Sequence, residues 1–404
     1  MGWGLTAVVS CLGVLGALVW IFLYVQFLVQ GRQMAVQIKD LPVTPPEGGW
    51  PTLAVAFAAR NEAAMVEAAA RSLLAQDYPG LEVIAVDDRS TDGTGEILDA
   101  LARDDPRLKV VHVHELPPGW LGKNHALQTA AESTAADWLL LTDADVVFAP
   151  DALRRSVAWA VGQRLDHLTL APDTVSETFG ERIFLAMFSL AFALKAPPWR
   201  IVDPRCKEAI GVGAFNLVRA EAFRAVGGFR RLALSVDDDM RLGQALKFAG
   251  YRPGVALALG EITVRWQIGF GGMIRGLEKN FFAALDFRLA FVFFVVAVLI
   301  TVGVMPFVGL FIGPWWTRAV CAAGVGSVAA VLAEAKGQHG VKWYHGLFLP
   351  VGALACAFAL LRSTVLTLKN GGVRWRDHLY PLDELKAHTR RRNAWLREVW
   401  LSTR

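Results

Sequence analysis

The sequence contains little cysteine, and its positive and negative side chains are nearly equal in number. The 404 residues include only four cysteines, Cys11, Cys206, Cys321 and Cys356. They are scattered and lie mostly in apolar segments, so the sequence indicates neither a disulfide framework nor a zinc site. The formal net charge of +4 at pH 7 is too small to argue for nucleic-acid binding. We therefore expect no nucleic-acid partner.

Charged side chains are missing altogether from the first 29 residues. This apolar stretch is longer than the ~20 residues that a helix needs to cross a bilayer. It lacks the basic start and the small-residue cleavage site of a secretory signal, so we expect an uncleaved transmembrane anchor over residues 1–30. Arg32 and Lys39 follow it, which by the positive-inside tendency predicts a cytosolic location for the next domain.

Three later segments are also long and nearly uncharged: Leu289–Gly313, Trp315–Ala335 and Trp343–Leu368. They predict a C-terminal transmembrane region over 289–368 with two to three helices. Residues 369–404 are rich in arginine and are expected to form a basic cytosolic tail. Because an anchor and three full crossings would leave this tail outside, we expect that one segment does not cross fully. The protein is expected to be a multi-pass protein of the cell (inner) membrane.

Between these segments, residues 50–280 alternate short apolar runs with helix-like patterns. The apolar runs are Leu53–Ala58, Leu81–Val86, Leu108–His114 and Trp138–Leu141. This order predicts a parallel α/β sheet with helices on both faces. Ligands of such sheets bind at the carboxyl ends of the strands, which is where we expect the site.

Two acids one residue apart follow the fourth apolar run. Asp143 and Asp145 flank Ala144, and side chains at i and i+2 of a strand share a face. Like charges this close are costly unless a cation lies between them, and hard divalent cations take oxygen ligands that substrate phosphates often complete. The pair predicts a metal–diphosphate site. Taken alone, an acid pair capping a helix after Pro150 would explain it equally simply.

Polar residues also follow the first two runs. Asn61 and Glu62 come after the first, and Asp87 and Asp88 come after the second. An aspartate there can accept a hydrogen bond from a base such as uracil, whereas Asp92 is explained by helix capping alone. Three polar groups at strand ends predict a site rather than three unrelated loops.

Two further groups can serve this site. Lys123 follows Gly122, a glycine that allows close backbone approach, and offers a point charge for a diphosphate; a solvated lysine is the commoner alternative. The run Asp237-Asp238-Asp239 is either the acidic first turn of a helix or the source of a general base for an acceptor hydroxyl. Spacing does not decide between these.

Two other features leave alternatives open. His112 and His114 share a strand face, but a third ligand is not apparent nearby, so a zinc site is not predicted. Ile183–Ala196 is apolar and too short to span a bilayer. It is either an interfacial helix or a buried core helix.

The order of the motifs resembles the membrane-anchored family 2 glycosyltransferases with a GT-A fold. The matching residues are Ala59-Arg60-Asn61-Glu62, Val86-Asp87-Asp88-Arg89-Ser90-Thr91-Asp92-Gly93-Thr94, Gly122-Lys123, Asp143-Ala144-Asp145, Gly227-Gly228-Phe229 and Asp238-Asp239. Within the family, the chain looks most like the ceramide-glucosyltransferase-like and the carotenoid or hopanoid lipid glycosyltransferases. The resemblance implies an α/β GT-A domain (nucleotide-diphospho-sugar transferase, Rossmann-like) over residues 50–280, flanked by transmembrane helices.

The resemblance also implies roles. The donor-binding residues would be Ala59, Asn61, Glu62, Asp87, Asp88, Lys123 and Asp143, with Asp87 or Asp88 holding the nucleotide base. Asp143 and Asp145 would bind Mg²⁺ or Mn²⁺. Asp239 would be the general base, and Asp238 stands where glutamate is usual.

One family motif departs from its pattern. A Q/R-x-x-R-W motif is expected after the base, but Arg-Trp is absent around residues 275–280; Arg265-Trp266 lies early and Arg374-Trp375 lies late. In processive polysaccharide synthases of the family, that tryptophan helps to bind the acceptor, so its loss favours a single transfer.

We therefore expect an inverting, metal-dependent hexosyltransferase that moves one sugar from a UDP-sugar to a membrane lipid at the cytosolic face. The alternatives are a processive polysaccharide synthase and a non-catalytic membrane scaffold that retains the fold.

Overall fold

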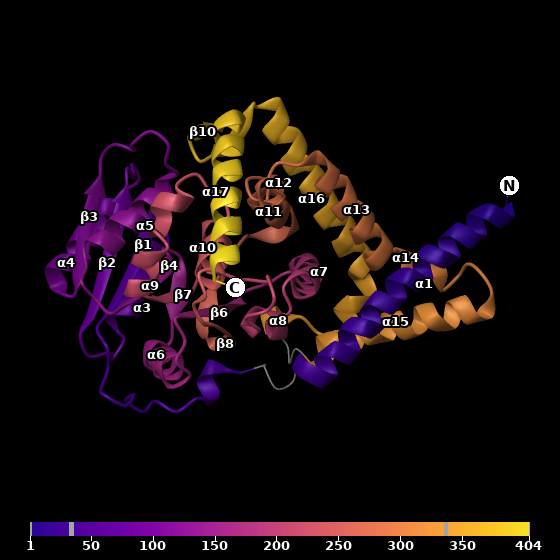
Figure 1. Cartoon of the computed structure of the whole chain (residues 1–404), viewed down its shortest axis with the longest axis horizontal. Coiled ribbons are helices and arrows are strands. Elements are labelled where there is room, and N and C mark those ends of the chain that lie inside the picture. Colours follow the sequence, from indigo (N-terminus) through magenta and orange to yellow (C-terminus); the bar gives the residue numbers. More distant parts are fainter. Residues whose placement is uncertain (1, 32–35, 335–337, 404) are drawn as a thin grey trace. The chain divides into compact units, whose positions relative to one another are not determined.

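The computed structural model describes residues 2–31, 36–334 and 338–403 (Figure 1). This described part of the chain forms two compact units, and neither is continuous in sequence. The sheet unit holds the described residues of 34–173, 198–265 and 387–404. The helical unit holds the described residues of 1–33, 174–197 and 266–386.

The described residues of the sheet unit form an eight-stranded sheet with the order β3-β2-β1-β4-β7-β6-β8-β5. Its strands are β1 (Leu53–Ala59), β2 (Leu81–Asp88), β3 (Leu108–Val113), β4 (Trp138–Asp143), β5 (Val146–Phe148), β6 (His167–Thr174), β7 (Asn216–Arg219) and β8 (Pro253–Val264). Its helices are α3 (Val66–Leu74), α4 (Thr94–Asp104), α5 (Gly122–Glu132), α6 (Ala152–Gly162), α8 (Pro198–Val202), α9 (Ala220–Ala225), η3 (Gly228–Leu232), α10 (Asp238–Phe248) and the end of α17 (Leu382–Ser402).

The first half of this sheet is parallel, as the strand–helix pattern predicts: β3, β2, β1 and β4 run in one direction. The second half is not parallel. β7 pairs antiparallel with β4, and β6 pairs antiparallel with β7. The prediction rested on the four runs that form β1 to β4 and is confirmed for them, whereas these antiparallel pairs lie beyond those runs. β7 has only four residues, too few for a sequence period to show.

Both faces of the central strands are buried. Leu53, Val55 and Phe57 of β1 pack in one cluster with α3, α4 and α6, whereas Ala54 and Ala56 pack in another with α5, α9, α10 and α17. Strands covered on both faces are apolar at nearly every position. This explains why the strands are continuous apolar runs in the sequence.

The C-terminal segment is part of this core. Trp400 of α17 is buried, and its ring centroid lies 4.8 Å from that of Phe248 on α10. The Thr403 hydroxyl donates a hydrogen bond to the Phe248 carbonyl at 2.9 Å. The sequence predicts only a basic tail here, but Leu396 and Trp400 are four residues apart and so share one helix face.

The helical unit contains α1 (Gly2–Gln26), α7 (Phe179–Lys195), α11 (Gly269–Gly276), α12 (Phe281–Ala284), α13 (Leu289–Gly303), α14 (Met305–Gly309), α15 (Trp315–Glu334), η5 (Trp343–Phe348), α16 (Leu349–Lys369) and the hairpin of β9 (Gly372–Trp375) and β10 (His378–Pro381).

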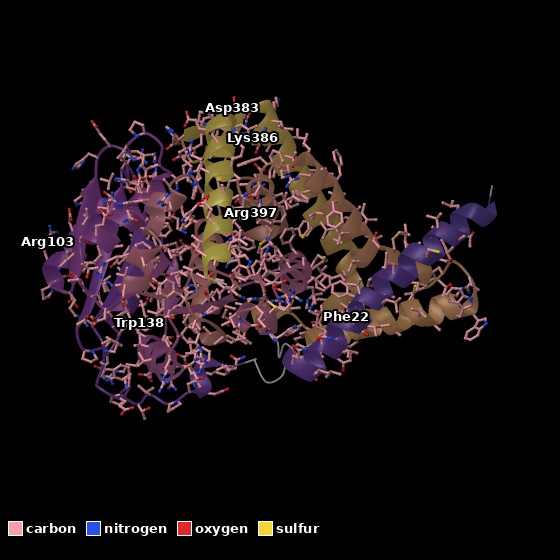
Figure 2. All side chains as sticks on the ribbon, in the orientation of Figure 1. Phe22, Arg103, Trp138, Asp383, Lys386 and Arg397 are labelled. Atoms are coloured by element: carbon pink, nitrogen blue, oxygen red, sulfur yellow. The ribbon has the colours of Figure 1, made fainter. Side chains whose placement is uncertain are left out.

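Among the described residues, the stretches that are long and apolar enough to cross a membrane are Gly4–Gly31, Leu289–Gly309, Trp315–Glu334 and Trp343–Lys369. They lie before and after residues 50–280 in sequence, as expected. Phe22 of α1 is one of their outward side chains, 64% exposed (Figure 2). Arg32 and Ala335, which enter the topology prediction, lie outside the described residues.

Small residues bring these helices close together. Gly324 of α15 lies against Ala17 of α1, and Gly303 of α13 lies against Ala353 of α16, in both cases too close for a larger side chain. The Trp20 indole donates a hydrogen bond to the Val302 carbonyl at 2.7 Å. Such close contacts are typical of helices packed in a bilayer.

The apolar segment Ile183–Ala196 falls in α7, which is largely a packed helix. Phe184 is fully buried, and Met187 lies against Gly352 of α16. Phe188 and Phe192 are half-buried. Of the two alternatives, burial in a helical core describes the first half of this segment.

We predict that Trp400→Ala destabilises the protein, because removing a buried tryptophan costs about 3–5 kcal/mol. Leu401, the next residue, is 63% exposed, so Leu401→Ala should change the free energy of unfolding by less than about 0.5 kcal/mol. Unfolding of the full-length chain in detergent, followed by circular dichroism, measures both. Equally small effects would show that α17 is not part of the core.

Candidate functional site

The register of the parallel strands brings the predicted site residues to one edge of the sheet. Ala59, the last residue of β1, pairs with Asp87 of β2, and Ala58 pairs with Asp143, the last residue of β4. Asp88 ends β2 and is buried. The carboxyl ends of these strands therefore present the acids together, at the edge where α/β sheets bind ligands.

The loops after β1 and β2 are tied to each other. The Asn61 backbone N–H donates to Ser90 Oγ at 3.1 Å, and the Thr91 N–H donates to Asn61 Oδ1 at 2.8 Å. The Ala63 N–H donates to Asp92 Oδ2 at 3.0 Å. Asn61 has a positive φ of 54°, a conformation that asparagine tolerates better than most residues. Asn61, which is predicted to bind the sugar donor, thus connects the two loops through hydrogen bonds.

The two acids at the end of β2 have different partners. Asp88 accepts hydrogen bonds from Arg89 Nε at 2.7 Å and Arg89 Nη2 at 3.0 Å. Gly122, at the start of α5, lies so close to the Asp88 carboxylate that a side chain would not fit. The absence of a side chain at Gly122 therefore lets the backbone of α5 approach the Asp88 carboxylate.

Asp87 faces an imidazole. Its Oδ2 lies 3.1 Å from His112 Nδ1, and its Oδ1 accepts a hydrogen bond of 3.3 Å from the Ser90 N–H. His112 Nε2 lies 3.1 Å from Asp99. Hydrogen bonding to Asp87, and then to Asp99, raises the pKa of His112. Two neighbouring carboxylates favour the charged form of an imidazole, which is the direction in which the pKa of His112 moves.

Lys123 joins the two predicted acid groups. Its Nζ lies 2.6 Å from Asp143 Oδ1 and 3.6 Å from Asp238 Oδ2. Burial by itself lowers the pKa of a lysine, but Asp143, Asp238 and Asp239 outweigh it, and the pKa of Lys123 is raised. The ammonium group therefore stays charged and links the carboxyl end of β4 to the first turn of α10.

Asp145 lies where negative charge accumulates. Burial, and then repulsion by Asp143 and Glu62, raise the pKa of Asp145 to about 6. Oxygen donors with excess negative charge suit a hard divalent cation. Within the described part of the chain, three or more His, Cys, Asp or Glu side chains do not group as a metal site. The role of Asp143 and Asp145 as metal ligands therefore stays a prediction.

The second acid cluster forms the start of α10. Asp237 precedes the helix and pairs with Arg241 at 2.9 Å. Asp238 is buried, and Asp239 is half-buried. Burial, and then Asp238, raise the pKa of Asp239 to about 7. A carboxyl group with a pKa near neutrality is suited to take up a proton, so this helix start has the chemistry of a general base.

Sequence reasoning missed two parts of this edge. Gly211 packs on the backbone of Asp239, and Gly213 packs on the Asp143 carboxylate, both too close for a side chain. Asn124 Nδ2 donates to the Leu232 carbonyl at 2.8 Å. The Gly-x-Gly spacing was an available signal for close backbone approach. Asn124 had no such signal, because its partner lies 108 residues away.

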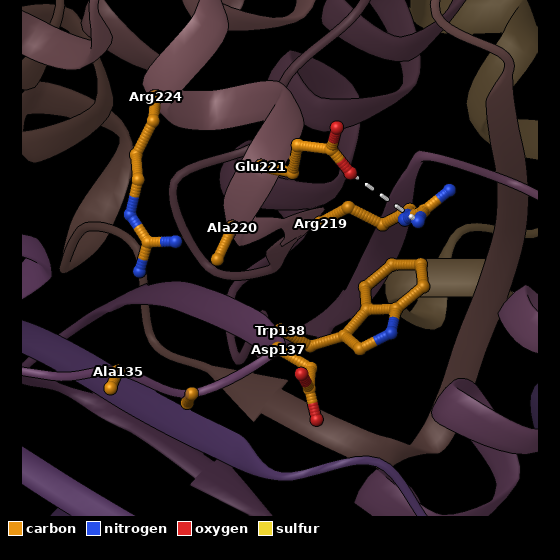
Figure 3. A pocket seen from close by; sticks show the side chains of 8 residues that line it. Ala135, Asp137, Trp138, Arg219, Ala220, Glu221 and Arg224 are labelled. Atoms are coloured by element: carbon orange, nitrogen blue, oxygen red, sulfur yellow. Dashed lines mark ion pairs between the residues drawn. The ribbon is translucent and has the colours of Figure 1, made fainter.

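A pocket of about 300 Å³ lies at the opposite end of β4 (Figure 3). Its lining is Ala135, Ala136, Asp137, Trp138, Arg219, Ala220, Glu221 and Arg224. Trp138 begins β4, whereas Asp143 ends it. Arg219 and Glu221 pair with each other at 3.7 Å. This pocket is therefore separate from the acidic edge.

Known proteins resemble this chain in sequence. The family model described as glycosyl transferase family 2 matches residues 54–227. A beta-monoglucosyldiacylglycerol synthase of Synechocystis sp. is 32% identical over 195 residues, which are 48% of this chain and 40% of that protein. The chain thus spans less than half of that relative. The succinoglycan biosynthesis protein ExoA of Rhizobium meliloti is 30% identical over 246 residues, which are 55% of this chain and 67% of that protein.

A solved structure resembles the fold. It is the mannosyltransferase PcManGT from Pyrobaculum calidifontis, in complex with GDP-Man and Mn²⁺, with a TM-score of 0.55 and 20% identity. The match covers 87% of this chain and 99% of that one. At this identity it shows the fold alone, and it confirms the expected GT-A class. The match to the family model and the similarity to ExoA, of which the match covers 67%, together show that the chain belongs to glycosyl transferase family 2.

Proposed function

We propose that this protein transfers one sugar from a UDP-sugar to a membrane lipid, with inversion, at the cytosolic face. The observation that carries the proposal is the acidic edge, where Lys123 contacts Asp143 and Asp238. The described residues also include four apolar stretches long enough to span a bilayer. Membership of glycosyl transferase family 2 indicates that the reaction is a sugar transfer. A relative named as a glucosyldiacylglycerol synthase supports a lipid acceptor.

The donor would bind along the carboxyl ends of β1, β2 and β4. Asp87 or Asp88 would accept the base N–H; each already has a hydrogen-bond partner on both oxygens, Asp88 from Arg89 and Asp87 from His112 and Ser90. Ala59, Asn61 and Glu62 lie along the same edge and stay predicted donor residues.

Asp143 and Asp145 would hold Mg²⁺ or Mn²⁺. When bound, the ion would offset the negative charge of the diphosphate leaving group. Lys123 would add to this at the same edge, since its Nζ is 2.6 Å from Asp143. The solved neighbour with Mn²⁺ and GDP-Man supports a divalent ion here.

Asp239 would act as the general base. It takes the proton of the acceptor hydroxyl, whose oxygen then forms a bond to the anomeric carbon. The bond from that carbon to the UDP oxygen breaks, and UDP leaves with the electron pair. A single displacement of this kind inverts the anomeric centre.

The chain segments that make up the sheet unit support a C-terminus on the same side of the membrane as the catalytic domain, which we propose is the cytosolic side. Residues 387–404 belong to the same compact unit as the described residues of 34–173, so both lie on one side of the membrane. Three of the four apolar stretches lie between residues 265 and 387. A chain that leaves one side and returns to it crosses an even number of times. We therefore propose that at most two of these three stretches cross fully.

Polysaccharide synthesis is the second candidate, because ExoA is named for succinoglycan biosynthesis. The two Arg-Trp pairs lie apart from the acidic edge in sequence, and both tryptophans are engaged in the helical unit. Trp266 lies 5.1 Å from the Phe188 ring, and Lys279 Nζ lies 3.6 Å from the Trp375 ring. These contacts favour single transfer over processive synthesis.

Asp145→Asn is expected to abolish metal-dependent donor binding without unfolding the protein, because it removes one charge of the acid pair. Calorimetric titration of UDP in Mn²⁺ measures the affinity. Asp151→Asn, at an exposed acid before α6, is the matched control and should bind as the wild type does. Wild-type affinity of Asp145→Asn for UDP, unchanged by EDTA, would refute the assignment.

Asp239→Asn is expected to keep donor binding and to lose ~10²–10⁴-fold in turnover, the usual cost of removing a general base. Wild-type turnover should fall as the pH drops below about 7, because the protonated form of Asp239 cannot take a proton. If Asp239 serves only the helix start, the variant should instead melt at a lower temperature while the folded fraction turns over normally.

The product is expected to be a monoglycosylated lipid, since both ends of the catalytic domain connect to apolar helices. Incubating membranes with radiolabelled UDP-sugars and partitioning the label between organic and aqueous phases tests this. Label in the organic phase, with one sugar per lipid by mass spectrometry, is the expected outcome. Label in a high-mass, water-soluble polymer would instead establish the synthase alternative.

A further inference from the structure

The C-terminal helix carries a buried arginine. Arg392 of α17 is 4% exposed, whereas Arg390 and Arg391 beside it are exposed. Burying a guanidinium group is costly unless it is paired and hydrogen-bonded. Arg392 must therefore find its partners inside the sheet unit.

Arg392 Nε and Nη2 donate to Asn393 Oδ1 on the same helix, at 3.2 and 3.0 Å. Its other terminal nitrogen, Nη1, contacts the segment that leads into the second acid cluster. Arg392 Nη1 donates to Ser235 Oγ at 3.3 Å and lies 3.9 Å from Asp237 Oδ1. His388, one turn earlier on α17, places Nε2 3.4 Å from the same Ser235 Oγ. Burial, and then repulsion by Arg392, lower the pKa of His388 to about 4. The positive charge that α17 brings to this segment is therefore that of Arg392.

The same segment is held from its other side by α5. Asn124, which follows Lys123, donates its side-chain N–H to the carbonyls of Leu232 at 2.8 Å and Ser235 at 3.0 Å. Ser235 is thus held at its carbonyl by α5 and at its hydroxyl by α17. Two residues later the acid cluster begins with Asp237.

The acids of this cluster have different positively charged neighbours. Asp237 lies between two guanidinium groups, Arg241 at 2.9 Å and Arg392 at 3.9 Å. Asp238 faces Lys123 at 3.6 Å. Asp237 is thus held closely from within α10 by Arg241, and Arg392 is the charge that approaches it from α17, just before Asp238 and Asp239.

We propose that Arg392 is a positioning residue of the transferase site. Acting through Ser235 and Asp237, it sets Asp238 and Asp239 at the distance from Lys123 that the site needs. The acidic edge is then complete only after the chain has passed through its apolar helices and returned as α17. The effect on turnover rests on the proposed function; the effect on the position of the segment does not.

Hydrogen–deuterium exchange of the full-length protein in detergent tests the proposal without an assay. In Arg392→Met, peptides covering residues 235–240 should exchange about tenfold faster, while peptides of β1, β2 and β4 should not change. Arg391→Met removes the same charge from an exposed position of the same helix and should exchange as the wild type does. Arg392→Lys keeps the charge on a shorter side chain and should fall between.

A double variant shows whether the two residues act as one unit. Asp237→Asn alone should accelerate exchange in residues 235–240, and Asp237→Asn with Arg392→Met should be no faster than the faster single variant. Independent, multiplying effects would overturn the proposal. So would unchanged exchange in this segment, or equal acceleration throughout the sheet unit, which would mean general destabilisation.

Turnover then separates this proposal from the proposed function. Arg392→Met should lower kcat for UDP release by about tenfold or more, and keep the KM for the UDP-sugar within about threefold, as expected when only the transition state is affected. Faster local exchange with an unchanged kcat would overturn the positioning role. If the wild type itself releases no UDP, the proposed function fails, and the exchange data still decide whether Arg392 holds the segment.

Discussion

The acidic edge depends on one ammonium group. Lys123 is bound to Asp143 at 2.6 Å and faces Asp238 at 3.6 Å, so a single positive charge connects the end of a parallel strand with the start of a helix more than 90 residues later. Without it, the carboxylates of both groups would repel each other in a partly buried place. Burial, and then repulsion by neighbouring acids, raise the pKa values of Asp145 and Asp239 even with this ammonium group present.

Close packing of backbone holds this charge cluster in place. Gly122 lies against Asp88, Gly211 against Asp239 and Gly213 against Asp143. A side chain at Gly122 or Gly213 would meet a carboxylate, and a side chain at Gly211 would meet the backbone of Asp239. These glycines therefore allow the backbone to approach the acids closely.

The order of the chain adds a constraint on assembly. The sheet unit takes residues 387–404, the end of α17, from beyond the C-terminal apolar helices, and Arg392 contacts Ser235 across 157 residues of sequence. The sheet unit is therefore finished by the last part of the chain. Under the proposed function, apolar helices before and after residues 50–280 would confine the domain to the layer that holds the lipid acceptor, which would raise its effective concentration.

The sequence by itself determined the parts of this protein that have a local pattern. The apolar runs of β1, β2 and β4 placed Asp87 and Asp143 at strand ends, because a strand covered on both faces is apolar until it meets water. Long uncharged stretches likewise revealed the apolar helices, because a bilayer sets their length. Only the tertiary structure decided the antiparallel strand pairs, the hydrogen bonds of Asn124 to the Leu232 and Ser235 carbonyls, and the burial of Arg392. Those contacts join residues that are far apart in the chain, and a contact of that kind leaves no period or spacing in the sequence to be read.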